Sequence, residues 1–415
     1  MTDTSQPRAS ISPHIALNVS AFGADTLPLR SSSSAFLAIK VSAITKLFHI
    51  LWRFTDPMIP AFEDFFEMVR CVWRKLQLYA LALLHLWLST DKHMHNLDEQ
   101  TLRKKLNGAS EPEVLSSKRI IFVRHAESQW NVLFNRKGSK VLFLFRLIQA
   151  VLREWLLFPV MDSVFLDSPL STEGTEQAQK LRCKILATQR AFLSEGRGLQ
   201  DMQLPVDGLN PKKAFCSRKD AQYLLRYLCC AIPKSIVVSS NLRRAINTAA
   251  ITSASRLAVS GERLHVLSCL QEIGENVDTL ALSQAKCVVA PKISMRRKPQ
   301  ASNHVEVMLK SKRESSNFHK TMFDSSENHG NKAILGSAYD RLKHFAMWAT
   351  QRSENVIVVY GHSLWFQQFC ECYLPKDLDH PAKRSKLGNS GVVSFILQQS
   401  AEETFHIDAK SFLYH

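Results

Sequence analysis

The sequence predicts an α/β protein, namely a three-layer α/β/α sandwich with a mostly parallel central sheet and a helical extension at its N-terminus. Two observations support this expectation. From residue 118 onward, short apolar runs with the length of buried strands alternate with longer helical segments. Before that point, apolar residues recur at helical spacing instead. Alternation of strands and helices is typical of a parallel sheet that helices cover on both faces.

The individual elements can be assigned from their length and their flanking residues. Three segments, 172–186, 242–256 and 338–350, are expected to be helices. Ser171 or Thr172 is a suitable N-cap for the first, because a hydroxyl accepts a hydrogen bond from the free N–H groups of the first turn. Five apolar runs are expected to be strands, and they span residues 120–123, 236–238, 264–267, 356–359 and 392–397.

The first 35 residues differ from the rest in composition. They are rich in Ser and Pro and end in a run of four serines, so we expect residues 1–35 to be disordered. No apolar segment of the secretory type follows the initial polar residues, which favours a cytoplasmic protein. Acids are scarce there, so a transit peptide is an alternative, although Arg8 and Arg30 are few for one.

Residues 36–90 form an apolar helical extension, and residues 91–117 are polar and predict a linker. Apolar side chains in the extension recur three and four residues apart, as on one face of a helix. Its most apolar stretch, 76–88, is shorter than the roughly 20 residues that a membrane crossing needs. The extension is therefore expected to pack on the main domain. Peripheral contact of residues 36–90 with a membrane surface is the alternative, because basic residues border the apolar faces.

Composition bounds the class of partner. The chain has 415 residues, 45% of them hydrophobic, which is enough for one large domain or two modest ones. Its formal net charge is +16, which favours anionic partners. The nine cysteines are scattered and lack the spacing of zinc ligands, which fits a reducing compartment.

The ends of the predicted strands carry polar residues that suit chemistry on a phosphate. In open α/β sheets, ligands bind beyond the carboxyl ends of the strands. Guanidinium groups match phosphate oxygens, and imidazole is one of the few side chains that can attack phosphorus as a nucleophile. Each residue alone has a structural explanation, but together they predict one site at one rim. The residues at these strand ends are Arg124 and His125, Arg243 and Arg244, Glu272, and His362.

Five motifs resemble, in order, those of the histidine phosphatase superfamily, in its phosphoglycerate mutase-like branch. The first is RHAESQWN at 124–131. It is followed by SPLSTEGTEQA at 168–178, SSNLRRAINTA at 239–249, LQE at 270–272 and GHS at 361–363. The resemblance covers about residues 118–400, and five ordered motifs make it far more specific than a lone RHA would be.

The resemblance implies a role for each matched residue. His125 would be the nucleophile that forms a phosphohistidine, and Glu272 would be the general acid and base. Positive charge from arginines would stabilise the transferring phosphoryl group, so that neither a metal nor a cofactor is expected. The residues that would hold the phosphoryl oxygens are Arg124, Arg244 and His362. The motifs further mark as substrate-binding residues Ser128, Asn131 and Ser363.

Several positions depart from the family pattern. Ala126 replaces the more usual glycine, and Asn241 stands where proline is common. After Glu272 the sequence lacks the glycine-tryptophan-glutamate-glycine string of many members, so Glu275 and Asp278 compete with Glu272 for the role of the acid. Residues 361–363 also lack the His-Asp pair of the acid-phosphatase branch, which favours an acid elsewhere in the chain.

Two insertions interrupt the predicted catalytic domain, which spans residues 118–415. The first, at about 136–166, is apolar on most faces and must be covered by other residues. We expect the N-terminal extension to cover it, with Trp73 and Trp155 buried between the two. The second, at about 286–335, is basic and is expected to be a solvated loop.

The predicted function is phosphomonoester hydrolysis through a phosphohistidine. The substrate class is left open among small molecules, lipid phosphates and phosphoproteins, because the loops that select it vary within the family. A phosphotransferase of the mutase type is the nearest alternative, and a catalytically silent, membrane-associated scaffold on the same fold is another. Nucleic acid is not an expected partner, because basic residues are not interleaved with aromatic ones.

Overall fold

The computed structural model describes residues 58–91, 114–136, 138–194, 225–289, 322–401 and 404–414. The predicted disordered N-terminus, the first part of the extension, most of the linker and most of the second insertion lie outside these ranges. The chain divides into two units, Met1–Phe65 and Phe66–His415. In the first unit only the start of helix α2 (Met58–Leu88) is described, and the sheet lies in the second.

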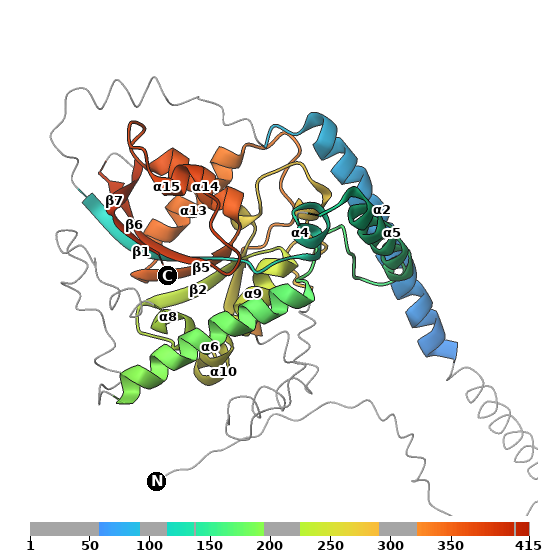
Figure 1. Ribbon diagram of the computed structural model, residues 1–415, viewed down its shortest axis with the longest axis horizontal. Coiled ribbons are helices and arrows are strands. Elements are labelled where there is room, and N and C mark those ends of the chain that lie inside the picture. Colours follow the sequence, from blue (N-terminus) through green and yellow to red (C-terminus); the bar gives the residue numbers. More distant parts are fainter. Residues whose placement is uncertain are drawn as a thin grey trace, which may run out of the picture. The chain divides into compact units, whose positions relative to one another are not determined.

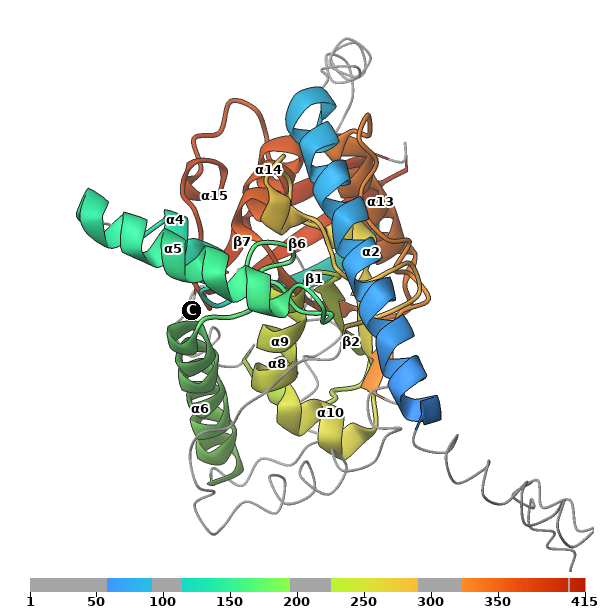
Figure 2. The ribbon, with the colours of Figure 1, turned by 90° about the vertical axis from the view of Figure 1, so that its right-hand side faces the viewer.

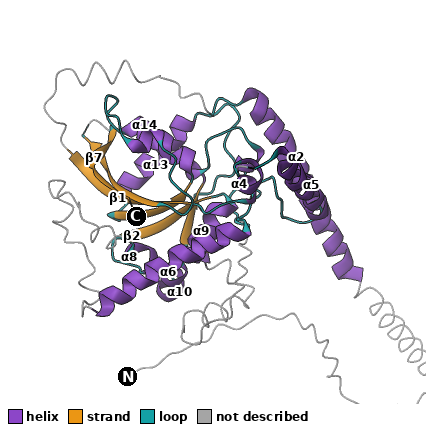
Figure 3. Ribbon diagram, in the orientation of Figure 1, coloured by secondary structure: helices purple, strands orange, loops and turns teal. Residues whose placement is uncertain are grey.

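The described residues contain a seven-stranded sheet with the order β4-β3-β2-β5-β1-β6-β7 (Figure 3). Strands β4 to β1 in this order are parallel, whereas β6 and β7 are antiparallel and close one edge. The mostly parallel sheet is therefore confirmed. The strands are β1 (Val114–Arg124), β2 (Ser235–Ser240), β3 (Leu264–Leu267), β4 (Phe323–Asp324), β5 (Val356–Gly361), β6 (Val392–Ser400) and β7 (Phe405–Tyr414).

Helices cover both faces of the sheet, as the three-layer prediction requires (Figure 1). Successive residues of β1 point to opposite faces. Ile121 packs in one buried cluster with Ile246, and Phe122 packs in another, with its ring 6.0 Å from that of Trp365. One face carries α6 (Thr172–Ser194), α8 (Arg226–Cys229), α9 (Arg243–Thr252) and α10 (Ala254–Ser260), and the other carries α13 (Ala338–Gln351), α14 (Ser363–Tyr373) and α15 (Pro381–Arg384).

Every strand and helix predicted from residue 118 onward is present among the described residues; β3 has the predicted bounds, and the bounds of the others differ. The helix expected over 242–256 is two helices, because the backbone of Ser253 leaves the helical conformation between α9 and α10. Strand β1 begins at Val114, inside the range predicted as linker. Strand β7 and helix α14 were not predicted. The buried residues of α14, namely Trp365, Phe366, Phe369, Cys370 and Tyr373, do lie on one helical face.

The second half of α2 packs against α5 (Lys140–Leu157), the helix of the first insertion (Figure 2). Lys75 donates a hydrogen bond to the carbonyl O of Leu157 at 2.6 Å, and Tyr79 donates one to Glu154 at 2.9 Å. The expected packing of the extension on the insertion is thus confirmed for this part of α2, and residues 39–57 lie outside the described ranges. No helix among the described residues is long and apolar enough to cross a membrane.

The expected burial of two tryptophans between these helices is wrong. Trp73 is 63% exposed and Trp155 is 76% exposed. The reason is that the facing sides of α2 and α5 are joined by polar side chains, so the large apolar residues lie on the outward sides.

Helix α6 is held against the segment that follows β1. Ser171, just before the helix, donates its backbone N–H to the carbonyl O of Glu127 at 2.9 Å. At Gly174, in the first turn of α6, an added Cβ would lie 1.9 Å from that same carbonyl oxygen. Only glycine permits this approach of two backbones, and the approach fixes the segment that carries the first motif.

We expect Gly174→Ala to destabilise the protein severely, by about 3 kcal/mol or more, because backbone must move to admit the methyl group. Gly388→Ala is the matched control, since an added Cβ there meets nothing within 4 Å and φ is not positive. Thermal unfolding of the two variants checks the prediction. Equal melting temperatures would show that the contact at Gly174 is not tight.

Candidate active site

The carboxyl ends of three neighbouring strands bring the predicted residues together. Strands β2, β5 and β1 are adjacent in the sheet. Arg124 lies opposite Gly361 in the parallel pairing of β1 with β5, and the backbone N–H of His125 donates to the carbonyl O of Gly361 at 3.0 Å. His125 and His362 therefore leave adjacent strands at the same level, with ring centroids 5.1 Å apart.

The imidazole of His125 is buried, with 4% of the residue exposed, and one of its nitrogens is fixed. Nδ1 lies 2.6 Å from the carbonyl O of Ala126. Because a carbonyl oxygen only accepts hydrogen bonds, Nδ1 carries the proton and Nε2 bears the free lone pair. Ala126 is itself held by Thr248, whose hydroxyl accepts the Ala126 N–H at 3.1 Å. The backbone thus presents Nε2 as the atom that can attack.

The surroundings of His125 also keep it neutral. Burial, and then the charges of Arg244 and Arg124, lower its pKa well below the ordinary value of 6.5. Burial and neighbouring cations both disfavour the imidazolium form. A neutral imidazole in a cationic setting is suited to attack an anion.

His362 has one nitrogen engaged and one open. Its Nε2 lies 2.9 Å from the hydroxyl of Ser240, and that hydroxyl accepts the N–H of Leu242 at 3.3 Å. When the Ser240 hydroxyl donates its proton to His362 Nε2, the ring proton lies on Nδ1. That Nδ1 is buried without a hydrogen-bond partner among the described residues. In that tautomer, the Nδ1–H could donate a hydrogen bond to a phosphoryl oxygen.

Glu272 is the carboxylate that lies with the two histidines. One oxygen accepts the backbone N–H of Trp365 at 3.0 Å, at the start of α14, and that of Ile273 at 3.1 Å. The other lies 3.9 Å from Nδ1 of His362. Burial raises the pKa of Glu272, against the charge of Arg244 and the hydrogen bond from Trp365, which lower it. At a given pH, a larger fraction of Glu272 is therefore protonated than of an ordinary glutamate, and the protonated form is the one that a general acid needs.

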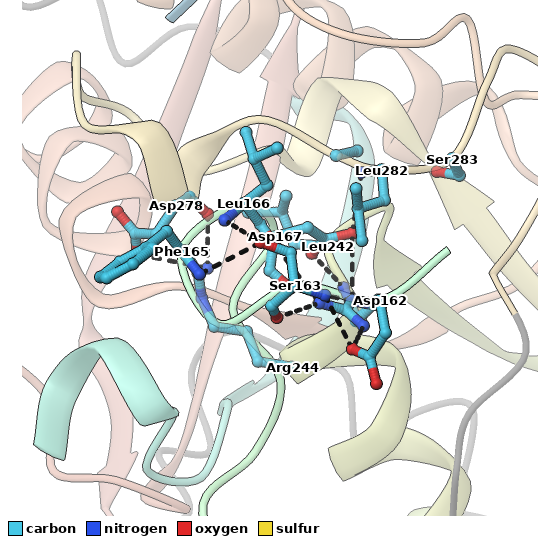
Figure 4. Close-up of polar contacts among 12 residues, drawn as sticks. Asp162, Ser163, Phe165, Leu166, Asp167, Leu242, Arg244, Asp278, Leu282 and Ser283 are labelled. Carbon is cyan, nitrogen blue, oxygen red and sulfur yellow. Dashed lines mark hydrogen bonds and ion pairs between the residues drawn. The ribbon is translucent and has the colours of Figure 1, made fainter. Parts of the chain in front are cut away.

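Two guanidinium groups border the same space. Arg244 donates to the carbonyl O of Asp278 at 2.7 Å and lies 3.4 Å from its carboxylate (Figure 4). Arg124 donates to the carbonyl O of Leu387, and its Nε has no hydrogen-bond partner within the described part of the chain. Asp278 is thus the ion-pair partner of Arg244. It is one of the two residues that competed with Glu272 as the acid.

The neighbouring Arg243 has a different role. It donates to the carboxylate of Asp162 at 2.6 Å, to the carbonyl O of Asp167 at 2.9 Å and to that of Ser163 at 2.9 Å. All three acceptors belong to the loop formed by residues 162–167. Arg243 therefore fixes a loop, which agrees with the choice of Arg244 as the site arginine.

Ser128 and Asn131 belong to the first motif and lie at the start of helix α4 (Gln129–Phe134). The hydroxyl of Ser128 caps α4 by accepting the N–H of Asn131, and the Asn131 side chain accepts the Ser128 N–H in return. Their side chains are thus engaged with each other. Ser363 is buried as the first residue of α14, directly after His362.

A second set of residues behind Glu272 was not predicted from the sequence. Asp91 is buried, lies 2.7 Å from Lys332 and also pairs with Arg341. Lys332 in turn donates to the carbonyl O of Glu272 at 2.9 Å. Burial lowers the pKa of Lys332 to about 8, against the charge of Asp91, which raises it. This network ties the end of α2 to the backbone of the acid, and nothing in the local sequence marks its members.

Three of the site residues also have the arrangement of metal ligands. One ligand atom each of His125, Glu272 and His362 lies within 4.8 Å of the others. Arg124 and Arg244 place two positive charges beside the same histidines. These charges disfavour a cation and favour an anion, so the prediction that no metal is required still stands as a prediction.

The pKa of His125 is directly testable. We expect the His125 ring to remain neutral at pH 6, where an ordinary histidine is mostly charged. NMR titration of the protein with ring-labelled histidine should show a resonance that does not shift between pH 8 and 6 and that disappears in His125→Ala. The exposed His344 is the matched control, and its resonance should disappear in His344→Ala. A His125 midpoint near 6.5 would contradict the prediction.

Comparison with known proteins gives likeness in structure only. No protein-family model matches the chain, and a search of curated proteins found no match. A mycobacterial glucosyl-3-phosphoglycerate phosphatase in complex with VO3 is 13% identical, with 71% of this chain and 98% of that one covered and a TM-score of 0.30. A phosphoserine phosphatase mutant from Entamoeba histolytica, in complex with phosphoserine, is 13% identical, with 72% and 94% covered and a TM-score of 0.29.

A phosphoglycerate mutase from Bacillus anthracis is 16% identical, with 71% of this chain and 92% of that one covered and a TM-score of 0.30. Each TM-score is below 0.5 and each identity is below 25%, so these likenesses alone settle neither activity nor substrate. Solved structures of phosphatases and of a phosphoglycerate mutase are thus among those to which this chain is similar.

Proposed function

We propose that this protein hydrolyses phosphomonoesters through a phosphohistidine on His125. The observation that carries the proposal is the state of that ring. Its Nδ1 is tied to the carbonyl O of Ala126, its pKa is lowered by burial and by two guanidinium charges, and Nε2 is left as a neutral nucleophile. A structural histidine needs neither an open nitrogen nor two arginines beside it, one of which, Arg244, is buried.

In the first step, Nε2 of His125 attacks phosphorus, a P–N bond forms, and the P–O bond to the leaving group breaks. Protonated Glu272 gives its proton to the leaving oxygen. The imidazole becomes cationic, and its Nδ1–H stays bonded to the carbonyl O of Ala126, which stabilises that charge. Arg124, Arg244 and the open Nδ1–H of His362 would hold the phosphoryl oxygens.

In the second step, the carboxylate of Glu272 takes a proton from water, and the water oxygen attacks phosphorus. The P–N bond breaks, its electron pair returns to Nε2, and inorganic phosphate leaves. Glu272 is then protonated again. In a mutase the second acceptor would be a hydroxyl of an organic phosphate instead of water, so release of inorganic phosphate separates the two activities.

We expect a labelled phosphomonoester, quenched rapidly with base, to leave acid-labile label on His125. Arg244→Ala should lower turnover by about a hundredfold or more, because it removes a preorganised charge from the phosphoryl group. His344→Ala, on the exposed side of α13, should change neither label nor turnover. Label that persists in His125→Ala would show that His125 is not the nucleophile.

The role of the acid can be separated from that of the nucleophile. We expect Glu272→Gln to slow hydrolysis of alkyl phosphates far more than that of aryl phosphates with good leaving groups, because only the former need a proton. Glu275→Gln is the matched control and should leave both rates nearly unchanged. The same leaving-group dependence in Glu275→Gln, and not in Glu272→Gln, would move the acid to Glu275.

A further inference from the structure

Helix α5 buries a charged residue and exposes apolar ones, whereas an ordinary surface helix buries its apolar side. The one buried residue that it contributes is Glu154. That carboxylate accepts hydrogen bonds from Tyr79 at 2.9 Å, from Ser163 at 2.8 Å and from the N–H of Val164 at 2.6 Å, and it lies 3.8 Å from the ammonium of Lys75. The inward side of α5 is therefore fixed by a polar anchor.

The outward side of α5 is apolar along its whole length. Six of its exposed large side chains recur at positions i, i+3, i+4, i+7, i+11 and i+14, which lie on one face of a helix. Leu142, Phe143, Val151 and Leu156 are exposed as well. The buried anchor on the opposite side fixes this orientation. The exposed residues of this face are Val141, Leu144, Phe145, Ile148, Leu152 and Trp155.

Helix α2 adds a second stripe of the same kind. Among its residues in the second unit, Leu78 and Ala82 are buried on the inward side. The outward side is apolar again, at spacings that keep it on one face. Its exposed residues are Phe66, Val69, Trp73, Leu76, Leu83 and Trp87.

The two stripes lie on one side of the second unit. Lys75, in the middle of α2, donates a hydrogen bond to the backbone of Leu157 at the end of α5. Both helices lie on the same side of the unit, and in Figure 2 the C-terminal end of α5 meets the middle of α2. We call the outward sides of α2 and α5 the apolar face. Helix α5 has 18 residues and is about 27 Å long, and its stripe from Val141 to Trp155 covers about 21 Å of that length. A continuous exposed patch of this extent marks a site of interaction with a partner or a membrane.

Charge indicates what the face meets. The only acid of α5 is the buried Glu154, whereas Lys140, Arg146 and Arg153 border its stripe. In α2 no acid follows Glu67. The chain as a whole carries a net charge of +16. An apolar stripe with aromatic residues and basic borders is the pattern of a helix that lies in the surface of an anionic bilayer.

From these observations we infer that the apolar face of α2 and α5 lies on a lipid bilayer that contains anionic lipids. The helices would lie in the plane of the surface, with Trp73 and Trp155 in the interfacial region and the bordering cations near headgroup phosphates. Neither helix is long and apolar enough to cross the bilayer.

Two other occupants fit the charges less well. A symmetric dimer would place the same patch against itself, so the cations bordering α5 would meet like charges. Residues 1–57 of the chain carry five Lys and Arg against three Asp, so they offer no complementary charge either. A bilayer supplies both the apolar interior and the negative surface.

Flotation of the full-length protein with vesicles tests the inference. We expect it to float with vesicles of phosphatidylcholine and phosphatidylserine, and far less with phosphatidylcholine alone. Leu152→Asn combined with Leu156→Asn should weaken binding by about tenfold or more, because both side chains are exposed and leave the bilayer without disturbing the core. The matched control is Leu335→Asn, at an apolar residue that is 75% exposed elsewhere in the chain.

Lys140→Gln combined with Arg146→Gln should remove the preference for phosphatidylserine and retain weak binding to either vesicle. Binding that is unchanged by the two leucine substitutions would overturn the inference. So would a protein that fails to float, whether it sediments as a dimer that Leu156→Asn dissociates or as a monomer. Vesicle binding needs no catalysis, so His125→Ala should float like the unsubstituted protein, and this separates the inference from the proposed function.

Discussion

The parallel register of β1 against β5 is the constraint on which the candidate site depends. Arg124 stands opposite Gly361, so the residue after each strand is a histidine and both emerge at the same rim. A shift of one residue would turn the apolar side chains of β1 toward the wrong faces, which the buried clusters on both sides exclude. At Gly361 an added Cβ would lie 2.9 Å from the ring of Phe122. The same register of β1 against β5 therefore determines both the packing of the core and the placement of the two histidines.

The electrostatics at the rim follow from the placement of two cations, Arg124 and the buried Arg244, beside two buried imidazoles. Burial, and then Arg244, lower the pKa of both His125 and His362, while burial raises that of Glu272. Groups whose pKa values move in opposite directions are suited to act as base or nucleophile and as acid at the same pH. Lys332 and Asp91 extend this network away from the rim and hold the backbone of Glu272. The position of Glu272 is thus fixed in part by Lys332, which contacts its backbone.

The extension and the first insertion carry the apolar face of α2 and α5, and the insertion also contacts the segment next to this rim. On α5 a carboxylate is buried and apolar residues are exposed. Exposure of apolar side chains to water is unfavourable, and contact with a bilayer would remove that surface from water. The same insertion is linked to the first motif, since Arg153 donates to Gln129 at 3.3 Å and the ring of Phe143 lies 6.2 Å from that of Phe134. Contact at the apolar face would thus act close to the segment that follows His125.

The sequence by itself determined the α/β class, the strands and helices of strong periodicity, and the group of residues at the strand ends. These features are local, because a strand shows its burial in its own residues and the chain places the next residue at the rim. It did not determine which acid lies near the histidines, since Glu272, Glu275 and Asp278 share one loop. Only the tertiary structure pairs Asp278 with Arg244 and places Glu272 beside His362.

Tertiary structure alone also decided the roles of residues far apart in the chain. Asp91 and Lys332 are 241 positions apart and become an ion pair only after folding. The apolar character of both segments predicted that α2 and α5 would meet, but not which sides would face each other. Burying Glu154 with four polar partners turned the tryptophans outward, because a buried carboxylate must be paired whereas an apolar side chain can be left exposed.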